Sequence, residues 1–210
     1  ELNKLKSDVK EFRRGNVVLK RGQTLFIAEV NSSPNIKLDL GKIYKRADKY
    51  VQQIVIPNNN EVKNILLWRT SDISKIERIM QDEGNWILLI KSATNVLKGD
   101  NFVFVYPELL QNKTILKRGE VIISEIVEKK DLDYKNINSK INNLMRKTRD
   151  KIKLRGSIVN EITTKGDFIN KIRNTFMKTK KNDKYLLEVV SLRESNTADQ
   201  IIVELNINEL

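Results

Sequence analysis

The 210-residue sequence contains neither cysteine nor histidine. The chain therefore cannot carry thiol chemistry, histidine-dependent acid–base catalysis or a zinc site built from Cys and His ligands. It also lacks a signal peptide and any apolar run near the roughly 20 residues that a membrane-spanning helix needs. The absence of cysteine fits a reducing cytosol and a disulfide-free envelope protein equally. Because the chain begins at Glu1 rather than Met, we expect it to be a piece of a longer protein.

Patterns typical of catalytic sites are also missing. No pair of carboxylates stands at a shared turn or strand end, and no phosphate-binding glycine motif or nucleophile elbow occurs. Asp72 and Asp167 each precede a stretch with helical spacing, where helix capping explains them. Trp68 and Trp86 border apolar runs and are expected in the core. We therefore predict a protein that is not an enzyme and that uses no cofactor and no metal ion.

The charged residues that are present are unbalanced. Lys and Arg number 39 against 27 Asp and Glu, which gives a net charge of +12 at pH 7. Such a protein attracts anionic partners, and nucleic acid, anionic lipid and acidic cell-wall polymer all qualify. A genome composition biased toward Lys, Asn and Ile explains the excess equally well. Net charge alone does not identify a partner.

One five-residue motif occurs twice. Leu19–Gln23 and Leu116–Glu120 share four residues, and their glycines, Gly22 and Gly119, lie 97 positions apart. A tight turn that needs the positive φ of glycine explains the motif structurally, and repetition favours this explanation. The alternative is a pair of symmetry-related anion contacts formed by Lys20, Arg21, Lys117 and Arg118.

The flanks of the motif repeat as well. Short β-branched runs, two stretches with helical spacing and further strand-like runs follow in the same order. The apolar stripe of the first helix recurs at a shift of 101, from Ile36, Leu40, Ile43, Tyr44, Ala47 and Val51 to Ile137, Ile141, Leu144, Met145, Thr148 and Ile152. The second helix recurs at a shift of 96, and the closing strands at a shift of 99. We predict an α+β fold of two tandem pseudo-symmetric repeats, each roughly ββαβαββ, over residues 15–110 and 111–210, either separate or fused into one domain.

Residues 1–14 show a different pattern. Leu2, Leu5, Val9 and Phe12 recur at spacings of three and four, as in a coiled coil or an amphipathic helix. Two heptads are too short to be stable alone in water. The segment is either a short helix that packs on the domain or, as we favour, the end of a longer coiled coil.

The basic excess gathers in the second repeat. Residues 140–184 contain 14 Lys and Arg against four Asp and Glu. The predicted anion-binding residues lie in and after the first helix of this repeat: Arg146, Lys147, Arg149, Lys153 and Arg155. A further basic run, Lys178, Lys180, Lys181 and Lys184, is expected in a loop. Such a surface predicts salt-dependent binding of a polyanion, although a solvated face without a partner fits equally well. Phe168 and Phe176 fall on the apolar face, so aromatic residues for base stacking are missing there.

Two stretches resemble a known bacterial family. Glu11–Gln23, and the join from Phe102–Tyr106 to Ile115–Glu120, are similar to the C-terminal region of the family described only as domain of unknown function 3084. The resemblance covers essentially the whole chain, including the duplication. It implies membrane helices and a long coiled coil ahead of this region, and no catalytic residues. By the positive-inside rule, it also implies that the domain lies outside the cytoplasm.

From these observations we expect a non-enzymatic binding or scaffolding head of a membrane-tethered coiled-coil envelope protein, with the head in the periplasm. We expect it to self-associate through the coiled coil and to present its basic face to an anionic polymer or lipid headgroups. The alternative is a cytoplasmic nucleic-acid-binding protein that uses the same face. An enzyme of another type would need a polar cleft, for example between the repeats.

Overall fold

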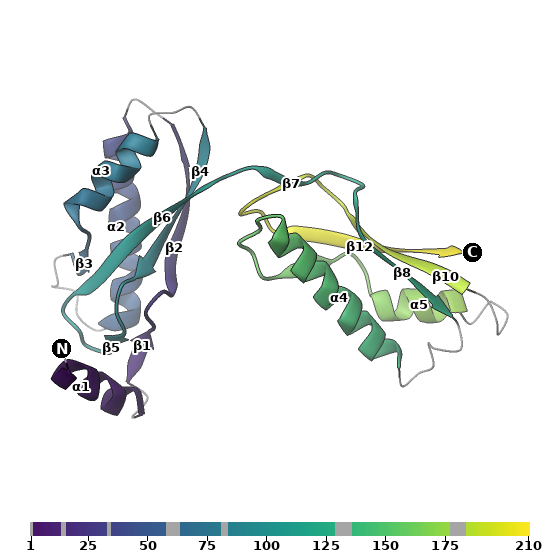
Figure 1. Ribbon diagram of the computed structural model, residues 1–210, viewed down its shortest axis with the longest axis horizontal. Helices are drawn as coiled ribbons and strands as arrows, with labels where there is room; N and C mark the ends of the chain where they lie inside the picture. Colours follow the sequence, from purple (N-terminus) through teal and green to yellow (C-terminus); the bar gives the residue numbers. More distant parts are fainter. Residues whose placement is uncertain are drawn as a thin grey trace. The chain divides into compact units, whose positions relative to one another are not determined.

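Strands and helices follow one another in the same order twice along the chain (Figure 1). The computed structural model describes residues 2–13, 16–32, 35–57, 64–80, 84–128, 136–176 and 184–210. The chain divides into a first unit, Glu1–Asn112, and a second unit, Lys113–Leu210. Each unit combines a four-stranded sheet, a separate strand pair and helices. The predicted α+β class with two tandem repeats is therefore confirmed.

The first unit begins with a helix and continues as a mixed sheet with two covering helices. Its elements are α1 (Leu2–Arg13), β1 (Val17–Leu19), β2 (Thr24–Asn31), α2 (Ile36–Val55), β3 (Leu66–Leu67), α3 (Thr70–Ile79), β4 (Asn85–Ser92), β5 (Val96–Leu97) and β6 (Val103–Gln111). The sheet order is β2-β4-β6-β3, and β1 pairs with β5. Strand β3 runs parallel to β6, whereas the other pairs are antiparallel.

The second unit repeats this topology. Its elements are β7 (Thr114–Leu116), β8 (Val121–Glu128), α4 (Ile137–Leu154), β9 (Ile162–Thr164), α5 (Phe168–Phe176), β10 (Lys184–Ser191), β11 (Ser195–Asn196) and β12 (Ile201–Glu209). The sheet order is β8-β10-β12-β9, and β7 pairs with β11. Each described unit thus contains one short strand more than the predicted pattern, β5 or β11. Two residues are too few to produce a recognisable periodicity in the sequence.

Helical periodicity explains both cores. Leu40, Ile43, Ala47 and Val51 are buried on one face of α2 and pack against the inner side of the sheet. The matching face of α4 is buried by Ile137, Ile141, Leu144, Thr148 and Ile152. In this stripe the hydroxyl of Thr148 donates to the Leu144 carbonyl at 2.8 Å, so its burial leaves no unsatisfied hydroxyl donor. Trp68 and Trp86 pack against the first core, as expected, and both are partly buried.

The strand register corrects the predicted alignment of the last strands of the two units, β6 and β12. Val105 lies beside Ser92 in the first unit, and Val203 lies beside Ser191 in the second. The last strands therefore correspond at a shift of 98 rather than 99, because the chain loses one residue between β11 and β12. As a result, Phe102, Phe104 and Tyr106 correspond to Gln200, Ile202 and Glu204.

The two predicted helix caps had different outcomes. The Asp167 carboxylate accepts the N–H groups of Ile169 and Asn170 at 2.9 and 3.1 Å, so it caps α5 as predicted. The prediction for Asp72 was wrong, because α3 begins at Thr70 and Asp72 lies inside its first turn. A carboxylate there still interacts favourably with the helix dipole.

Candidate functional site

The repeated motif forms a glycine turn anchored to the sheet. Gly22 and Gly119 have φ values of 79° and 77°, which non-glycine residues rarely adopt. Their N–H groups donate to the carbonyls of Ser92 and Ser191, both at 2.8 Å. The glycine is therefore explained by the turn conformation, which supports the structural explanation of the motif.

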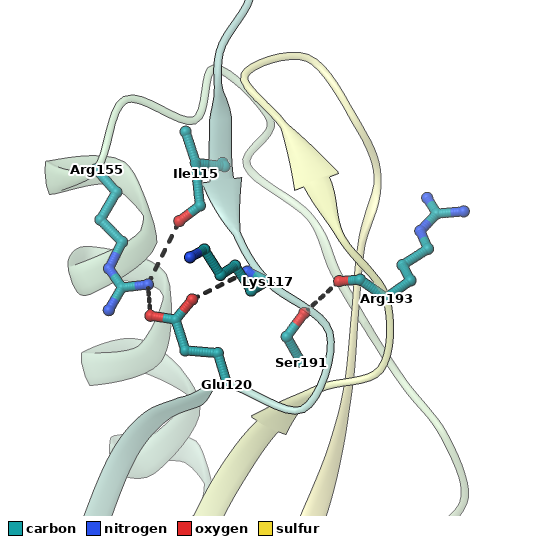
Figure 2. Close-up of polar contacts among 6 residues, drawn as sticks. All are labelled: Ile115, Lys117, Glu120, Arg155, Ser191 and Arg193. Atoms are coloured by element: carbon teal, nitrogen blue, oxygen red, sulfur yellow. Dashed lines mark hydrogen bonds and ion pairs between the residues drawn. The ribbon is translucent and has the colours of Figure 1, made fainter.

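The fifth residue of the motif closes the turn in both units. The Gln23 amide oxygen accepts the Lys20 N–H at 2.9 Å, and a Glu120 carboxylate oxygen accepts the Lys117 N–H at the same distance. In the second unit, the guanidinium of Arg155 also forms an ion pair with Glu120 (Figure 2). The same guanidinium donates to the Ile115 carbonyl at 3.3 Å. The Lys117 N–H and the Arg155 charge lower the pKa of the Glu120 carboxyl below its ordinary range.

Arg155 was predicted to bind an external anion, but the structure places it against the turn. Its side chain is 29% exposed and contacts a carboxylate and a backbone carbonyl of its own unit. A guanidinium engaged in this way offers little free surface to a partner. We therefore assign Arg155 a structural role.

The other predicted cations lie on different sides of α4. Arg146 forms an ion pair with Asp150 at 3.2 Å on the same helix. Lys147 forms one with Glu125 of β8 at 3.0 Å. Successive residues of a helix are rotated by about 100°, so these side chains do not converge on one point.

Arg149 and Lys153 complete the predicted set. The Nε of Arg149 donates to the Asn160 carbonyl at 3.1 Å, so this side chain also has an acceptor within its unit. Lys153 is exposed, and among the residues that the structure describes it has no carboxylate partner. Exposed Lys151 likewise has none within this part of the chain.

The predicted basic loop is mostly not described. Lys178, Lys180 and Lys181 lie outside the described residues. Lys184 begins β10, and its amine lies 3.8 Å from a carboxylate oxygen of Glu128.

Sequence reasoning missed a cavity in the first unit. The cavity has a volume of about 570 Å³ and is lined by Arg21, Leu67, Trp68, Arg69, Asp72, Ala93, Thr94, Phe104, Val105 and Tyr106. The Trp68 ring meets Tyr44 edge to face, with 5.5 Å between ring centroids. Four separate segments of the chain line this cavity, so no local pattern could have revealed it. The sequence does contain one indication of this region. Aromatic and valine residues alternate from Phe102 to Tyr106, which places the two kinds of side chain on opposite faces of a strand.

In this alternation the valine side chains face the core and the aromatic side chains face outward. Val103 and Val105 are buried in the core, whereas Phe102, Phe104 and Tyr106 are 58%, 51% and 37% exposed. The sequence pattern shows that the valine and aromatic side chains lie on opposite faces of the strand, but it does not indicate which face packs against the helices. Exposed aromatic side chains in a row are uncommon without a partner.

Neither a metal site nor a spanning helix was found in the described ranges. No three acidic side chains gather there in a way that could hold a metal ion. None of the helices described is both long and apolar enough to cross a bilayer. No protein-family model matches the chain, and neither characterised proteins nor solved structures show a significant match. The function must therefore be inferred from the geometry of the two units.

Proposed function

We propose that the chain is a non-enzymatic binding head whose second unit recognises an anionic partner through α4. One observation carries this proposal: α4 contains six Lys or Arg residues and a single carboxylate, Asp150. The ion pairs of Arg146 and Lys147 remove only part of this excess. Lys151 and Lys153 remain exposed, with no carboxylate partner among the described residues.

The partner chemistry follows from these cations. Lys151 and Lys153 lie about 200° apart around α4, so each would contact a separate phosphate or carboxylate of an extended polyanion. Each such contact contributes about 1 kcal/mol near a charged surface. An acidic cell-wall polymer and anionic lipid headgroups both present such groups. Binding by this surface is expected to weaken as salt rises, because exposed charges are screened.

The first helix supports the proposal of a coiled-coil tether. Leu2, Leu5 and Val9 recur at coiled-coil spacing and are 67%, 64% and 49% exposed, so this stripe is not covered by the rest of the unit. An exposed apolar stripe favours association with a second copy. The resemblance noted above suggests a membrane-tethered envelope protein that carries this head outside the cytoplasm, and we propose that arrangement here.

A matched pair of charge reversals tests the α4 surface. Lys151→Glu/Lys153→Glu changes two exposed cations of α4, whereas Lys45→Glu/Lys49→Glu makes the same change of net charge on α2. Binding of the 210-residue chain would be measured on phosphatidylglycerol vesicles and on poly(glycerol phosphate), with phosphatidylcholine vesicles as the neutral reference. We avoid Arg149 and Arg155 because both hold backbone carbonyls within the unit.

The α4 reversal is expected to lower the affinity for at least one anionic probe more than about tenfold at low salt. The α2 reversal should have a much smaller effect. Equal losses in both variants would show that only net charge matters and would refute the site. Tighter binding of a duplex oligonucleotide than of either probe would favour the nucleic-acid-binding alternative.

A further inference from the structure

The cavity of the first unit has the size and lining of a ligand site. Its volume of about 570 Å³ falls in the range of about 300–1,000 Å³ typical of small-molecule sites. The side chains of Trp68, Phe104 and Tyr106 provide aromatic surface, and Arg21, Arg69, Asp72 and Thr94 provide polar groups. This combination of apolar walls and a few polar groups is what a specific small ligand or polymer segment requires.

The scaffold itself does not need the aromatic row. Phe102, Phe104 and Tyr106 occupy the positions that Gln200, Ile202 and Glu204 occupy in the second unit. The second unit forms the same sheet without aromatic side chains there. Their exposure in the first unit is therefore better explained by a contact with another molecule than by folding.

The corresponding corner of the second unit is closed by hydrogen bonds. The Arg193 guanidinium donates to the Gln200 carbonyl at 2.6 Å, and the Gln200 side chain donates to the Thr163 hydroxyl at 2.9 Å. The first unit has Phe102 at the position of Gln200 and Leu67 at the position of Thr163. Phe102 and Leu67 cannot form the side-chain hydrogen bond of Gln200 and Thr163, and Thr94 stands at the position of Arg193. The same topology thus carries a polar network in one unit and a ligand-sized cavity in the other.

Two guanidinium groups belong to the lining of the cavity, those of Arg21 and Arg69. In the part of the chain that the structure describes, neither Arg21 nor Arg69 has a carboxylate within ion-pair distance. The single lining carboxylate, Asp72, lies 3.9 Å from the amine of Lys75. Guanidinium groups bind carboxylates and phosphates through two parallel hydrogen bonds. A ligand that carries such a group would find its counter-charge here.

We propose that this cavity binds an acidic sugar residue of a glycan. A sugar ring presents an apolar C–H face, and the negative face of an aromatic ring attracts C–H groups. The Asp72 carboxylate and the Thr94 hydroxyl can accept hydrogen bonds from sugar hydroxyls, while Arg21 and Arg69 bind the acidic group. The site lies in the first unit and is independent of the proposed α4 surface.

The site can be tested with the intact 210-residue chain and defined probes. These are tetragalacturonate as the acidic glycan, maltotetraose as the neutral glycan and a deoxythymidylate hexamer as the nucleic acid. Both tryptophans, Trp68 and Trp86, lie in the first unit, so tryptophan fluorescence reports binding there. Calorimetric titration would supply the affinities.

Two variants and one control separate the contributions. Phe104→Ile introduces the side chain of the corresponding position in the second unit and removes an exposed ring. Arg69→Gln removes a guanidinium but keeps a hydrogen-bonding side chain. Ile126→Ser is the control, because Ile126 is an apolar side chain 62% exposed on β8 of the second unit. All three positions are exposed, so the melting temperatures should stay close to that of the parent chain.

Tetragalacturonate is expected to bind and to change the tryptophan fluorescence, and maltotetraose is expected to bind more weakly. Phe104→Ile and Arg69→Gln should each lower the affinity for tetragalacturonate about tenfold, the effect of losing one stacked ring or one charged hydrogen-bonding group. The control should bind as the parent does. Absence of tetragalacturonate binding, preference for the oligonucleotide, or equal affinity in all variants would overturn the proposal.

Discussion

Gln23 and Glu120 occupy the same position of the glycine turn, and each accepts the N–H of the residue three positions earlier. An amide oxygen is therefore sufficient to close the turn. The carboxylate of the second unit adds an ion pair with Arg155, which ties the turn to the end of α4 (Figure 2). This addition makes the second turn sensitive to pH, whereas the first has no titratable group at that position.

Glu120→Gln tests this difference. The variant should keep the hydrogen bond to the Lys117 N–H but lose the ion pair, which lowers the free energy of unfolding by about 0.5–1 kcal/mol at neutral pH. Because the folded-state pKa of Glu120 is lowered, its contribution is complete above the pKa of an unfolded-chain glutamate, about 4.3. The contribution is lost as the pH falls through the lower folded-state pKa. Urea denaturation at neutral and acidic pH should show a weaker pH dependence in the variant, and identical pH dependence would contradict this role.

Asp48 provides a second contrast between equivalent positions. Its side chain is 3% exposed and accepts the N–H groups of Ile65 and Leu66, both at 2.8 Å. It thereby fixes the chain that enters β3. The equivalent residue of α4, Arg149, instead donates to the Asn160 carbonyl ahead of β9. Side chains of opposite charge therefore hold the segment before β3 in the first unit and before β9 in the second. The positive charge of Arg149 alone does not indicate a residue that binds a partner.

Asp48→Ala should be strongly destabilising. It leaves two buried N–H groups without their acceptor, which costs about 2–5 kcal/mol of the free energy of unfolding. Asp39→Ala on the same helix is the control, because the ion pair of Asp39 is with exposed Lys42 and its loss should change stability by less than about 1 kcal/mol. Chemical denaturation followed by tryptophan fluorescence reports the first unit. Equal losses in both variants would refute the role of Asp48.

At the scale of elements, the helices differ in how completely their apolar faces are covered. The stripe of α2 is buried in the first core, whereas that of α1 is exposed. An isolated 12-residue helix is marginal in water, so α1 gains stability if a second copy covers its stripe.

Leu2→Lys/Leu5→Lys tests this element. Both substitutions place charges in the stripe and should shift the chain toward the monomer in sedimentation equilibrium. Lys6→Gln/Lys10→Gln changes exposed polar positions of the same helix and should leave association unchanged. A parent chain that is monomeric at all measured concentrations would contradict self-association through α1.

Elements with strong periodicity could be predicted from the sequence, and the shift of 101 between α2 and α4 matches their buried faces. The strands β5 and β11 could not, because two residues carry no period. The cations of the second repeat could be recognised in the sequence, but the carboxylates with which they form ion pairs could not. Glu120 and Glu125 are brought to them by tertiary packing. The cavity of the first unit could not be predicted either, since its lining comes from separate segments.

At the scale of the whole molecule, one fold occurs twice with different surfaces. Both units keep the glycine turn and the arrangement of core residues. The first unit has exposed aromatic side chains beside a cavity. Helix α4 of the second unit carries six Lys or Arg and one Asp, whereas α2 carries five and two. This difference agrees with the proposal that the two units bind different partners.

The location of this domain in the cell is the measurement that tests the proposed function most directly. Protease would be added to intact spheroplasts that express the full-length protein, and digestion of the domain would be followed with an antibody against the 210-residue region. We expect digestion from outside, because an envelope head must lie beyond the cytoplasmic membrane. Protection until the cells are lysed would contradict an envelope function and would favour nucleic-acid binding in the cytosol.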